Sequence, residues 1–266
     1  KIFRALLLAS FVATCDAATF NVTTTASSGP GSLAQAVIDA NANSEDDTIT
    51  FASAIAGQTI QVTSLLNVSN RSITINGETN NAGMVLDASF SDRIFGVAAG
   101  ATLNLFGLNL TRGLNAAGAG AVESSGILMA TRCSFYGNQG SFGGAVSSFG
   151  SSLVLRHCTF QGNTASHSGG AVNCASGTLE ITHCTITGNS AANNGGGVNV
   201  GEASFTLMGS IIAMMKEPRD IESAIVTFLV TGSGLSIAGV GSAFWGLVAG
   251  LALFGARRNS RGDRKS

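Results

Sequence analysis

Cysteine and basic or imidazole side chains recur at a fixed spacing in the second half of the sequence. The cysteines are Cys133, Cys158 and Cys184, and the residues directly before them are Arg132, His157 and His183. Thiolate sulfur and imidazole nitrogen are common ligands of zinc and copper. Neighbouring residues of a strand point to opposite faces, however, so the cysteines and the histidines do not converge on one ion.

We interpret the three cysteines as a column of inert buried thiols, because Cys is among the most buried residue types. A disulfide between neighbouring turns is the alternative, since Cys174 makes the number of cysteines after a cleaved leader even. Two imidazoles one turn apart could share a metal ion, but they lack a third ligand nearby and are interpreted as surface residues. The sequence predicts no metal ligand and no cofactor.

Carboxylates are the next candidates for chemistry. Glycoside hydrolysis generally needs two carboxylates about 5–9.5 Å apart, and a polyuronide lyase needs acidic Ca²⁺ ligands and a base. Within residues 101–200 the only carboxylates are Glu123 and Glu180, and there is no Asp or Lys. They occupy different strands of the repeat described next, so we expect them on different faces. The sequence predicts no catalytic residue.

All these residues lie in a repeat of 25 or 26 residues, with units at 100–124, 125–149, 150–175 and 176–201. Apolar residues keep their places from unit to unit. One column is Leu103, Leu128, Leu153 and Leu179, another is Leu108, Cys133, Cys158 and Cys184, and a third is Leu110, Phe135, Phe160 and Ile186. A fixed period with constant internal phase indicates stacked turns, none of which can bury its apolar face alone.

The parity of the apolar positions predicts the path of each turn. Leu179 and Ile181 share one face of a strand, whereas Cys184 and Ile186 have the opposite parity, so the chain must bend at Thr182-His183. A second bend follows at Gly188-Asn189, and a third strand starts near Val198. Three short strands per turn and no helical periodicity between them predict an all-β fold, a single-stranded parallel β-helix.

Asparagine and glycine mark the corners of this coil. Asn138, Asn163 and Asn189 recur at one place, each after a Gly. Asn tolerates left-handed backbone angles, and its side chains stacked ~4.8 Å apart could form a hydrogen-bonded ladder. The recurring glycines of the repeat are Gly143, Gly144, Gly169, Gly170, Gly196 and Gly197.

The repeat resembles a known family of surface proteins. The runs Phe135-Tyr-Gly-Asn138 and Phe160-Gln-Gly-Asn163, alternating with GGAV, resemble the FxxN and GGA(I/V/L) repeats of the chlamydial polymorphic outer-membrane proteins. They also resemble bacterial β-helix proteins of the choice-of-anchor type, as do the opening GSLAQAVIDAN at 31–41 and the run SIIA at 210–213. The resemblance implies a right-handed β-helix at the cell surface or in the periplasm, and it implies no reaction. Met214-Met215 departs from the Gly-Asn turn of the family pattern.

The N-terminal residues have the order of an export signal. Lys1 and Arg4 precede an apolar run and then small residues, which predicts a signal peptide over residues 1–17. A lipid-modified Cys15 is the alternative reading. Residues 18–46 are predicted to form an N-terminal cap, in which a short helix covers the open end of a β-helix spanning residues 47–213.

The C-terminal residues predict a membrane anchor. Residues 235–255 are 21 uncharged residues, a length sufficient to cross a bilayer as a helix. Residues 256–266 form a basic tail that should stay in the cytoplasm. Residues 214–234 are a linker or a last strand. The alternatives for the apolar segment are a buried core helix and a sorting tail that is cut after export.

Composition narrows the function. Only 11% of residues are charged and the net charge is −1, so no basic surface for nucleic acid is expected. The sequence predicts an exported, membrane-anchored, non-enzymatic β-helix for surface display, adhesion or envelope structure, with a glycan or a host or cell-surface protein as partner. A polysaccharide-binding or pectate-lyase-like β-helix is the alternative, although Tyr136 is the only Tyr and Trp245 the only Trp.

Overall fold

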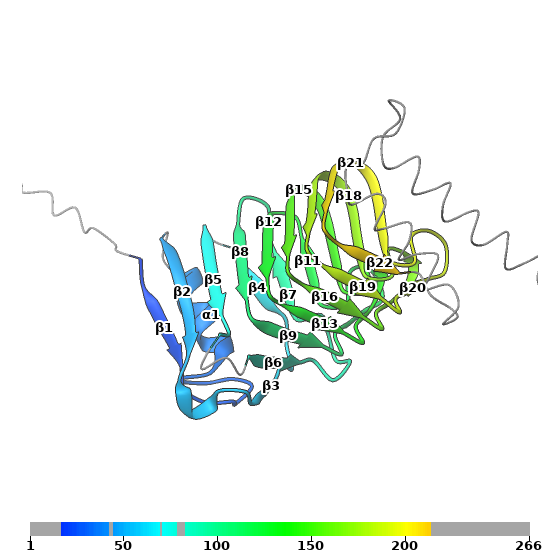
Figure 1. The fold of residues 1–266 in the computed structure, drawn as a ribbon. Coiled ribbons are helices and arrows are strands. Elements are labelled where there is room, and N and C mark those ends of the chain that lie inside the picture. The colour runs from blue at the N-terminus through cyan, green and yellow to red at the C-terminus, as the bar shows by residue number, and fades with distance from the viewer. Residues whose placement is uncertain (1–16, 43–44, 70, 79–82, 214–266) are drawn as a thin grey trace, which may run out of the picture.

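The computed structural model describes residues 17–42, 45–69, 71–78 and 83–213. In this part of the chain the strands form three parallel sheets that wind around one apolar interior. Figure 1 shows successive turns lying side by side along a single axis, with the N-terminal turns at one end and the turn that ends near residue 213 at the other. The fold is a parallel β-helix.

The largest sheet contains eleven of the described strands. They are β1 (Thr19–Val22), β2 (Asp46–Phe51), β4 (Leu66–Val68), β5 (Ser72–Asn76), β7 (Phe95–Val97), β8 (Thr102–Phe106), β11 (Val122–Ser124), β12 (Ile127–Thr131), β15 (Val146–Arg156), β18 (Val172–Thr182) and β21 (Val198–Met208).

The second sheet contains seven strands and the third contains four. The second consists of β3 (Thr59–Gln61), β6 (Met84–Asp87), β9 (Leu108–Thr111), β13 (Ser134–Tyr136), β16 (Thr159–Gln161), β19 (Thr185–Thr187) and β22 (Ile211–Ala213). The third consists of β10 (Leu114–Asn115), β14 (Gln139–Phe142), β17 (Thr164–Ser168) and β20 (Ser190–Ala191).

The register of the sheets confirms the apolar columns expected from the repeat. Leu128 pairs with Leu103 on one side and Leu153 on the other, and Leu153 pairs with Leu179. All four side chains are buried, as are those of the column that starts at Leu110. Inside that column the rings of Phe135 and Phe160 stack with centroids 4.5 Å apart. Columns of stacked apolar side chains therefore fill the interior turn by turn.

The later turns have three strands each, as expected, such as β18, β19 and β20, but the places of these strands differ from those expected. The third sheet adds a strand position that the sequence did not indicate, because its strands are only two to five residues long and lack alternation. The strand expected to start at Val198 also continues without a corner through residue 208. The pairing of β15 with β18 shifts register near Gly150 and Gly177, both of which have positive φ. The chain therefore bends within a continuous strand at this place, where the sequence indicated a corner between two strands.

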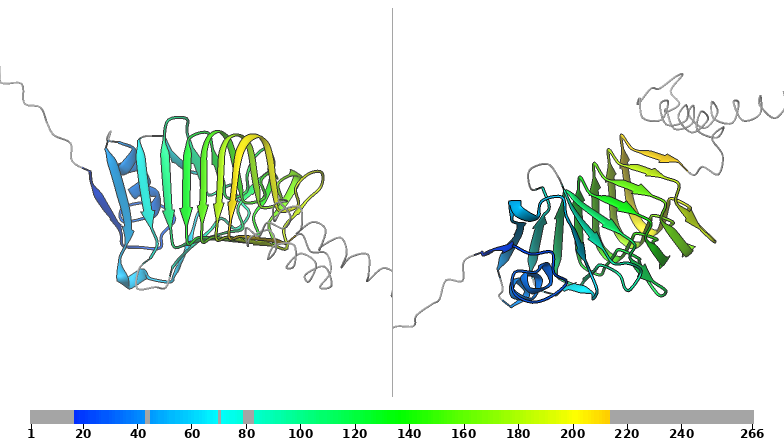
Figure 2. Two further views of the ribbon diagram at one scale, coloured as in Figure 1. Left: turned by 45° about the horizontal axis from the view of Figure 1, so that its top comes forward. Right: turned by 90° about the horizontal axis from the view of Figure 1, so that it is seen from below.

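A helix lies at the N-terminal end of the coil. Helix α1 (Leu33–Asn41) starts at Ser32, whose hydroxyl accepts a hydrogen bond of 3.2 Å from the backbone N–H of Gln35. Its apolar face, with Leu33, Val37 and Ala40, is buried, and α1 packs against β1, β2 and β4. Figure 2 shows α1 at the same end of the coil as β1 and β2. A short 3-10 helix, η1 (Ser53–Ile55), follows β2.

Several sequence-based expectations lie outside the described residues. They are nearly all of the signal peptide at 1–17, the linker or last strand at 214–234, the transmembrane helix at 235–255 and the basic tail at 256–266. Among the residues that the structure describes, none belongs to a helix with the length and apolar character of a membrane span.

The buried columns predict where substitutions will destabilise the protein. Replacing Leu105, which is fully buried in β8, with Ala should lower the free energy of unfolding by about 2–5 kcal/mol, through lost burial and the cavity left behind. Replacing Ile127, which is 39% exposed on the neighbouring strand, with Ala should change it by only about 0.5 kcal/mol. Urea denaturation followed by circular dichroism measures both, and equal losses would contradict this interior.

Candidate functional site

The three repeat asparagines form one hydrogen-bonded ladder inside the coil. The Nδ2 of Asn138 donates to the Oδ1 of Asn163 at 3.0 Å, and the Nδ2 of Asn163 donates to the Oδ1 of Asn189 at 2.9 Å. Each of these oxygens also accepts the backbone N–H of the preceding asparagine. The ladder begins at Gly113, whose N–H donates to the Oδ1 of Asn138 at 2.8 Å.

The ladder also satisfies backbone groups that the corner would leave without partners. The Nδ2 of each asparagine donates to a carbonyl of the preceding turn, which belongs to Leu110, Phe135 or Phe160. All three asparagines are buried. A buried amide without partners is costly, so these contacts fix both the corner and the register of each turn on the next. The ladder predicted from the sequence is confirmed.

The glycine clusters lie where neighbouring backbones pass too close for a side chain. A Cβ on Gly144 would come within 2.1 Å of the Gly170 carbonyl oxygen, and one on Gly170 within 1.9 Å of the Gly196 oxygen. Gly143, Gly169 and the equivalent residue of the next turn all have positive φ. That equivalent is Gly195. Comparison of the repeat units did not identify it, because the three consecutive glycines allow more than one register. Gly197 takes the place of Ala171 instead, as the pairing of Val172 with Val198 shows.

The cysteine column faces the interior, as expected. Cys133, Cys158 and Cys184 are buried, and with Cys174 they are free thiols among the described residues. The thiol of Cys158 donates to the Ala130 carbonyl at 3.3 Å, so it has a backbone partner. Hydrogen bonds with the thiols of Cys133 and Cys184, together with burial, raise the pKa of Cys158 well above its ordinary value. Such a thiol is a weak nucleophile and a weak metal ligand.

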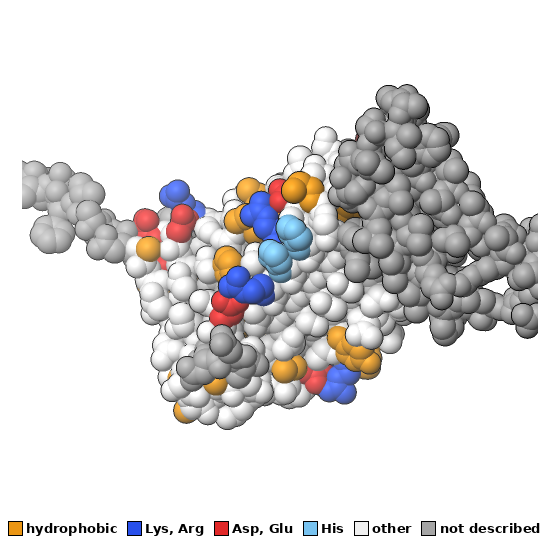
Figure 3. All heavy atoms as spheres, in the orientation of Figure 1, with side chains coloured by type: hydrophobic (Ala, Val, Ile, Leu, Met, Phe, Trp, Pro, Cys, Tyr) orange, Lys and Arg blue, Asp and Glu red, His pale blue; other side chains and the backbone are white. Residues whose placement is uncertain are grey.

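The histidines lie on the outside of the corner between the first and second sheets. The rings of His157 and His183 stack with centroids 5.0 Å apart and planes at 7°. Arg132, His157 and His183 have φ between 51° and 53°, and Gly107 and Gly209, at either end of this column, also have positive φ. All three side chains are exposed, as expected. Figure 3 shows two imidazoles together on this face, with basic and acidic side chains next to them.

The carboxylates of the repeat are each paired with an arginine, which the sequence analysis missed. Glu123 lies 2.6 Å from Arg93, and Glu180 lies 2.9 Å from Arg156. Arg132 likewise binds Glu78 and thereby lowers the pKa of that carboxyl. The pair of Arg156 and Glu180 could have been found by applying the period, because Glu180 stacks on Val154, two residues from Arg156. Both carboxylates of the repeat therefore have an arginine partner.

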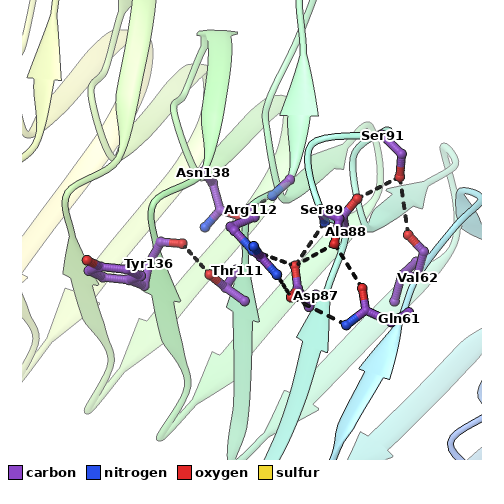
Figure 4. A network of polar contacts seen from close by, with 11 residues as sticks. Gln61, Val62, Asp87, Ala88, Ser89, Ser91, Thr111, Arg112, Tyr136 and Asn138 are labelled. Atoms are coloured by element: carbon purple, nitrogen blue, oxygen red, sulfur yellow. Dashed lines mark hydrogen bonds and ion pairs between the residues drawn. The ribbon is translucent and has the colours of Figure 1, made fainter.

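A second polar cluster surrounds Asp87 at the end of β6, and its members come from three neighbouring turns (Figure 4). Arg112 binds both carboxylate oxygens of Asp87, and the backbone N–H of Ser89 donates to Oδ1 at 2.9 Å. The hydroxyl of Ser89 in turn donates to Gln61 at 2.9 Å. Burial of Asp87 opposes ionisation, but the hydrogen bonds from Arg112 and Ser89 outweigh it, and the pKa is lowered.

The sequence offered little signal for this cluster. The chain before residue 100 does not keep the 25-residue period, since β5 and β8 pair residues 30 apart, such as Ile73 with Leu103. Arg112 nevertheless lies 25 residues after Asp87, and β6 pairs with β9 at a spacing of 24, so applying the period across residue 100 would have indicated this contact. Arg112 stands in the corner column of Gly137, Gly162 and Gly188 and shares their positive φ.

Two parts of the chain match families of membrane proteins. The family described as Chlamydia polymorphic membrane protein (Chlamydia_PMP) repeat matches residues 157–175, and the family described as benzoate membrane transport protein, BenE, matches residues 202–255. The inner membrane protein YdcO of Escherichia coli (strain K12) is 51% identical over 45 residues. These are 17% of this chain, which spans only 12% of the length of that protein. No solved structure matches.

The two family matches fall on different parts of the structure. The first runs from His157 through β16 and β17 into β18 and contains both FQGN and GGAV, so this β-helix carries repeats like those of the polymorphic membrane proteins. The second begins inside β21 and extends beyond the described residues. Each covers less than half of the chain, and together they fit a membrane-associated β-helix.

The ladder can be tested by removing one amide. Replacing Asn163 with Ala should cost at least about 2 kcal/mol of unfolding free energy, because several buried groups lose their partners. Asp at this position should not restore stability, since a carboxylate cannot donate to the Phe135 carbonyl. Gln161, exposed two residues earlier, is the matched control and should tolerate Ala. Urea denaturation of the three variants would reject the ladder if N163A and Q161A were equally stable.

The Asp87 cluster predicts a specific pH dependence. The pKa of Asp87 is lowered in the folded protein. The stability contributed by its ionised carboxylate is therefore complete above the ordinary Asp pKa of about 3.9, and it is lost as the pH falls through the lower folded-state pKa. Asp87→Asn should therefore cost about 1–3 kcal/mol at pH 7 and less at pH 3. Urea denaturation at both pH values measures this. An equal cost at pH 7 and pH 3 would show that the pair with Arg112 does not stabilise the fold.

Proposed function

We propose that this chain is an exported, membrane-anchored, non-enzymatic β-helix that serves surface display, adhesion or envelope structure. Residues 1–17 would direct export, the coil would lie on the non-cytoplasmic side, and residues 235–255 would hold it in the membrane as a helix with a basic cytoplasmic tail. The partner would be a glycan or a protein of a host or cell surface. The proposal includes right-handed winding and α1 as an N-terminal cap.

One combination of observations supports this proposal most directly. A coil with repeats like those of the polymorphic membrane proteins is followed, in the same chain, by a segment that matches a membrane transport family. The charged groups of the coil also have structural partners, since Glu78, Glu123 and Glu180 each bind an arginine. A polar outer surface whose glutamates are paired with arginines suits a scaffold for surface display.

A polysaccharide-binding or polysaccharide-cleaving β-helix is the second candidate. Tyr136 supports it, because 57% of this residue is exposed on the outer face of β13. Thr111 and Gln161 flank it on the neighbouring strands and offer hydrogen-bonding groups beside an aromatic ring. Sugar rings stack on such aromatic side chains, so the outer face of the second sheet is where a glycan would bind.

The anchor is tested by placing charge in the apolar segment. In a Cys15→Ser background, which excludes a lipid on that residue, replacing Leu247 and Leu251 with Arg should release the protein from membranes. Each Arg near the bilayer centre costs about 2.5–3.5 kcal/mol. Replacing the same leucines with Ile is the control and should leave the protein in the membrane fraction. Retention of the arginine variant would contradict the anchor.

Glycan assays separate the two candidates. The purified full chain in detergent should not cleave polyuronides, and Glu123→Gln and Glu180→Gln should leave any measured activity unchanged. If the protein cleaves such a polymer and either substitution removes the cleavage, the non-enzymatic proposal is wrong. Binding to a glycan array that is lost with Tyr136→Ala but retained with Gln139→Ala would favour a glycan as the partner.

A further inference from the structure

The last turn of the coil presents apolar side chains that every earlier turn buries. Phe205 stacks on Leu179 and Leu207 stacks on Ile181. Leu179 is 1% exposed and Ile181 is fully buried, whereas Phe205 is 43% and Leu207 44% exposed. Phe205 and Leu207, which are two residues apart and share one face of β21, form the end face. Met208 stacks on Thr182, in the column of Arg156, and therefore belongs to the outer face of the sheet.

The two ends of the coil differ. At the N-terminal end, α1 lies beside β1, β2 and β4 and its Leu33, Val37 and Ala40 are at most 2% exposed. At the other end, β21 pairs along its length with β18, and within the described part of the chain its second edge has no strand beside it. An edge with exposed apolar residues is a docking surface or an aggregation hazard, so it needs a partner.

The chain itself indicates what that partner is. It leaves the coil at this same end, since β22 closes the last turn at residue 213 and residues 214–266 follow. The match to the membrane transport family begins at Glu202, so it includes the end face together with the uncharged run at 235–255. Glu202 is also the one charged residue in β21, which suits an apolar contact better than an electrostatic one.

We propose that the end face lies against the lipid bilayer that holds the following segment, so that the β-helix stands on the membrane by its last turn. This inference rests on the proposed membrane anchor. The tether alone does not enforce the contact, because 21 linker residues at 214–234 can span up to about 70 Å when extended. Phe205 and Leu207 hold the coil at the surface by inserting at the boundary between headgroups and acyl chains.

A fluorescent probe distinguishes lipid contact from the alternatives. The full chain with Cys15→Ser is reconstituted into phosphatidylcholine vesicles, and an environment-sensitive dye is attached to Cys introduced at Phe205 or, as a control, at Ile38. Ile38 is 60% exposed on α1 at the opposite end, and the four native cysteines of the coil are buried and should not label. Nitroxide carried on the upper acyl chain of the lipid is the quencher.

The expected result is loss of most of the dye fluorescence at position 205 and little loss at position 38. The contact should not weaken in high salt, because it is apolar. Adding Leu207→Ser to the position-205 protein should reduce the quenching, whereas Thr206→Ser should not.

Each other outcome overturns the inference in a recognisable way. A dye at 205 that is hydrated and unquenched, in protein that floats with the vesicles, means that the anchor holds but the end face stays in water. A dye that is dehydrated but not quenched means that protein covers the end face, either a second copy or residues 214–234. Failure of the chain to float with vesicles contradicts both the inference and the anchor.

Discussion

The hydrogen bonds between the amides of Asn138, Asn163 and Asn189 fix the register of the three successive turns that contain them. The Asn138 and Asn163 amides each donate to the asparagine of the next turn, with N···O distances of 2.9–3.0 Å between the paired side chains. A slip of one residue would leave these buried groups without partners, which costs more than the apolar contacts could regain. The stacked leucines, phenylalanines and thiols follow from the register that the ladder imposes.

The same register explains why unusual residues are tolerated at the corners. Stacking brings the backbones of neighbouring turns so close that Gly144 and Gly170 have no room for a Cβ. It also aligns left-handed positions, at which His157 and His183 stand although glycine would cost less. Their rings stack outside the coil, while the cysteines that follow them point into the interior. The histidines and cysteines, whose spacing suggested a metal site, therefore lie on opposite faces of the sheet.

The interior could be predicted from the sequence because it repeats. Leu103, Leu128 and Leu153 keep one phase, so the buried columns, the exposed corner histidines and the asparagine ladder follow from the period alone. The strands of the third sheet did not follow, because strands as short as Ser190–Ala191 carry no alternation. The contact of Glu123 with Arg93, 30 residues apart, joins turns of unequal length, and the period does not indicate it. Asp87 and Arg112, in contrast, lie one 25-residue period apart.

Amide hydrogen exchange of the full chain, resolved by residue or peptide, tests the ladder most directly. The backbone N–H groups of Asn138 and Asn163, which donate to side-chain amides, should exchange as slowly as those of the buried strands β12, β15 and β18. The N–H groups of β21, at the last turn, should exchange faster. Fast exchange at Asn138 and Asn163, at the rate of exposed corners, would contradict the claim that the asparagine ladder holds the turns in register.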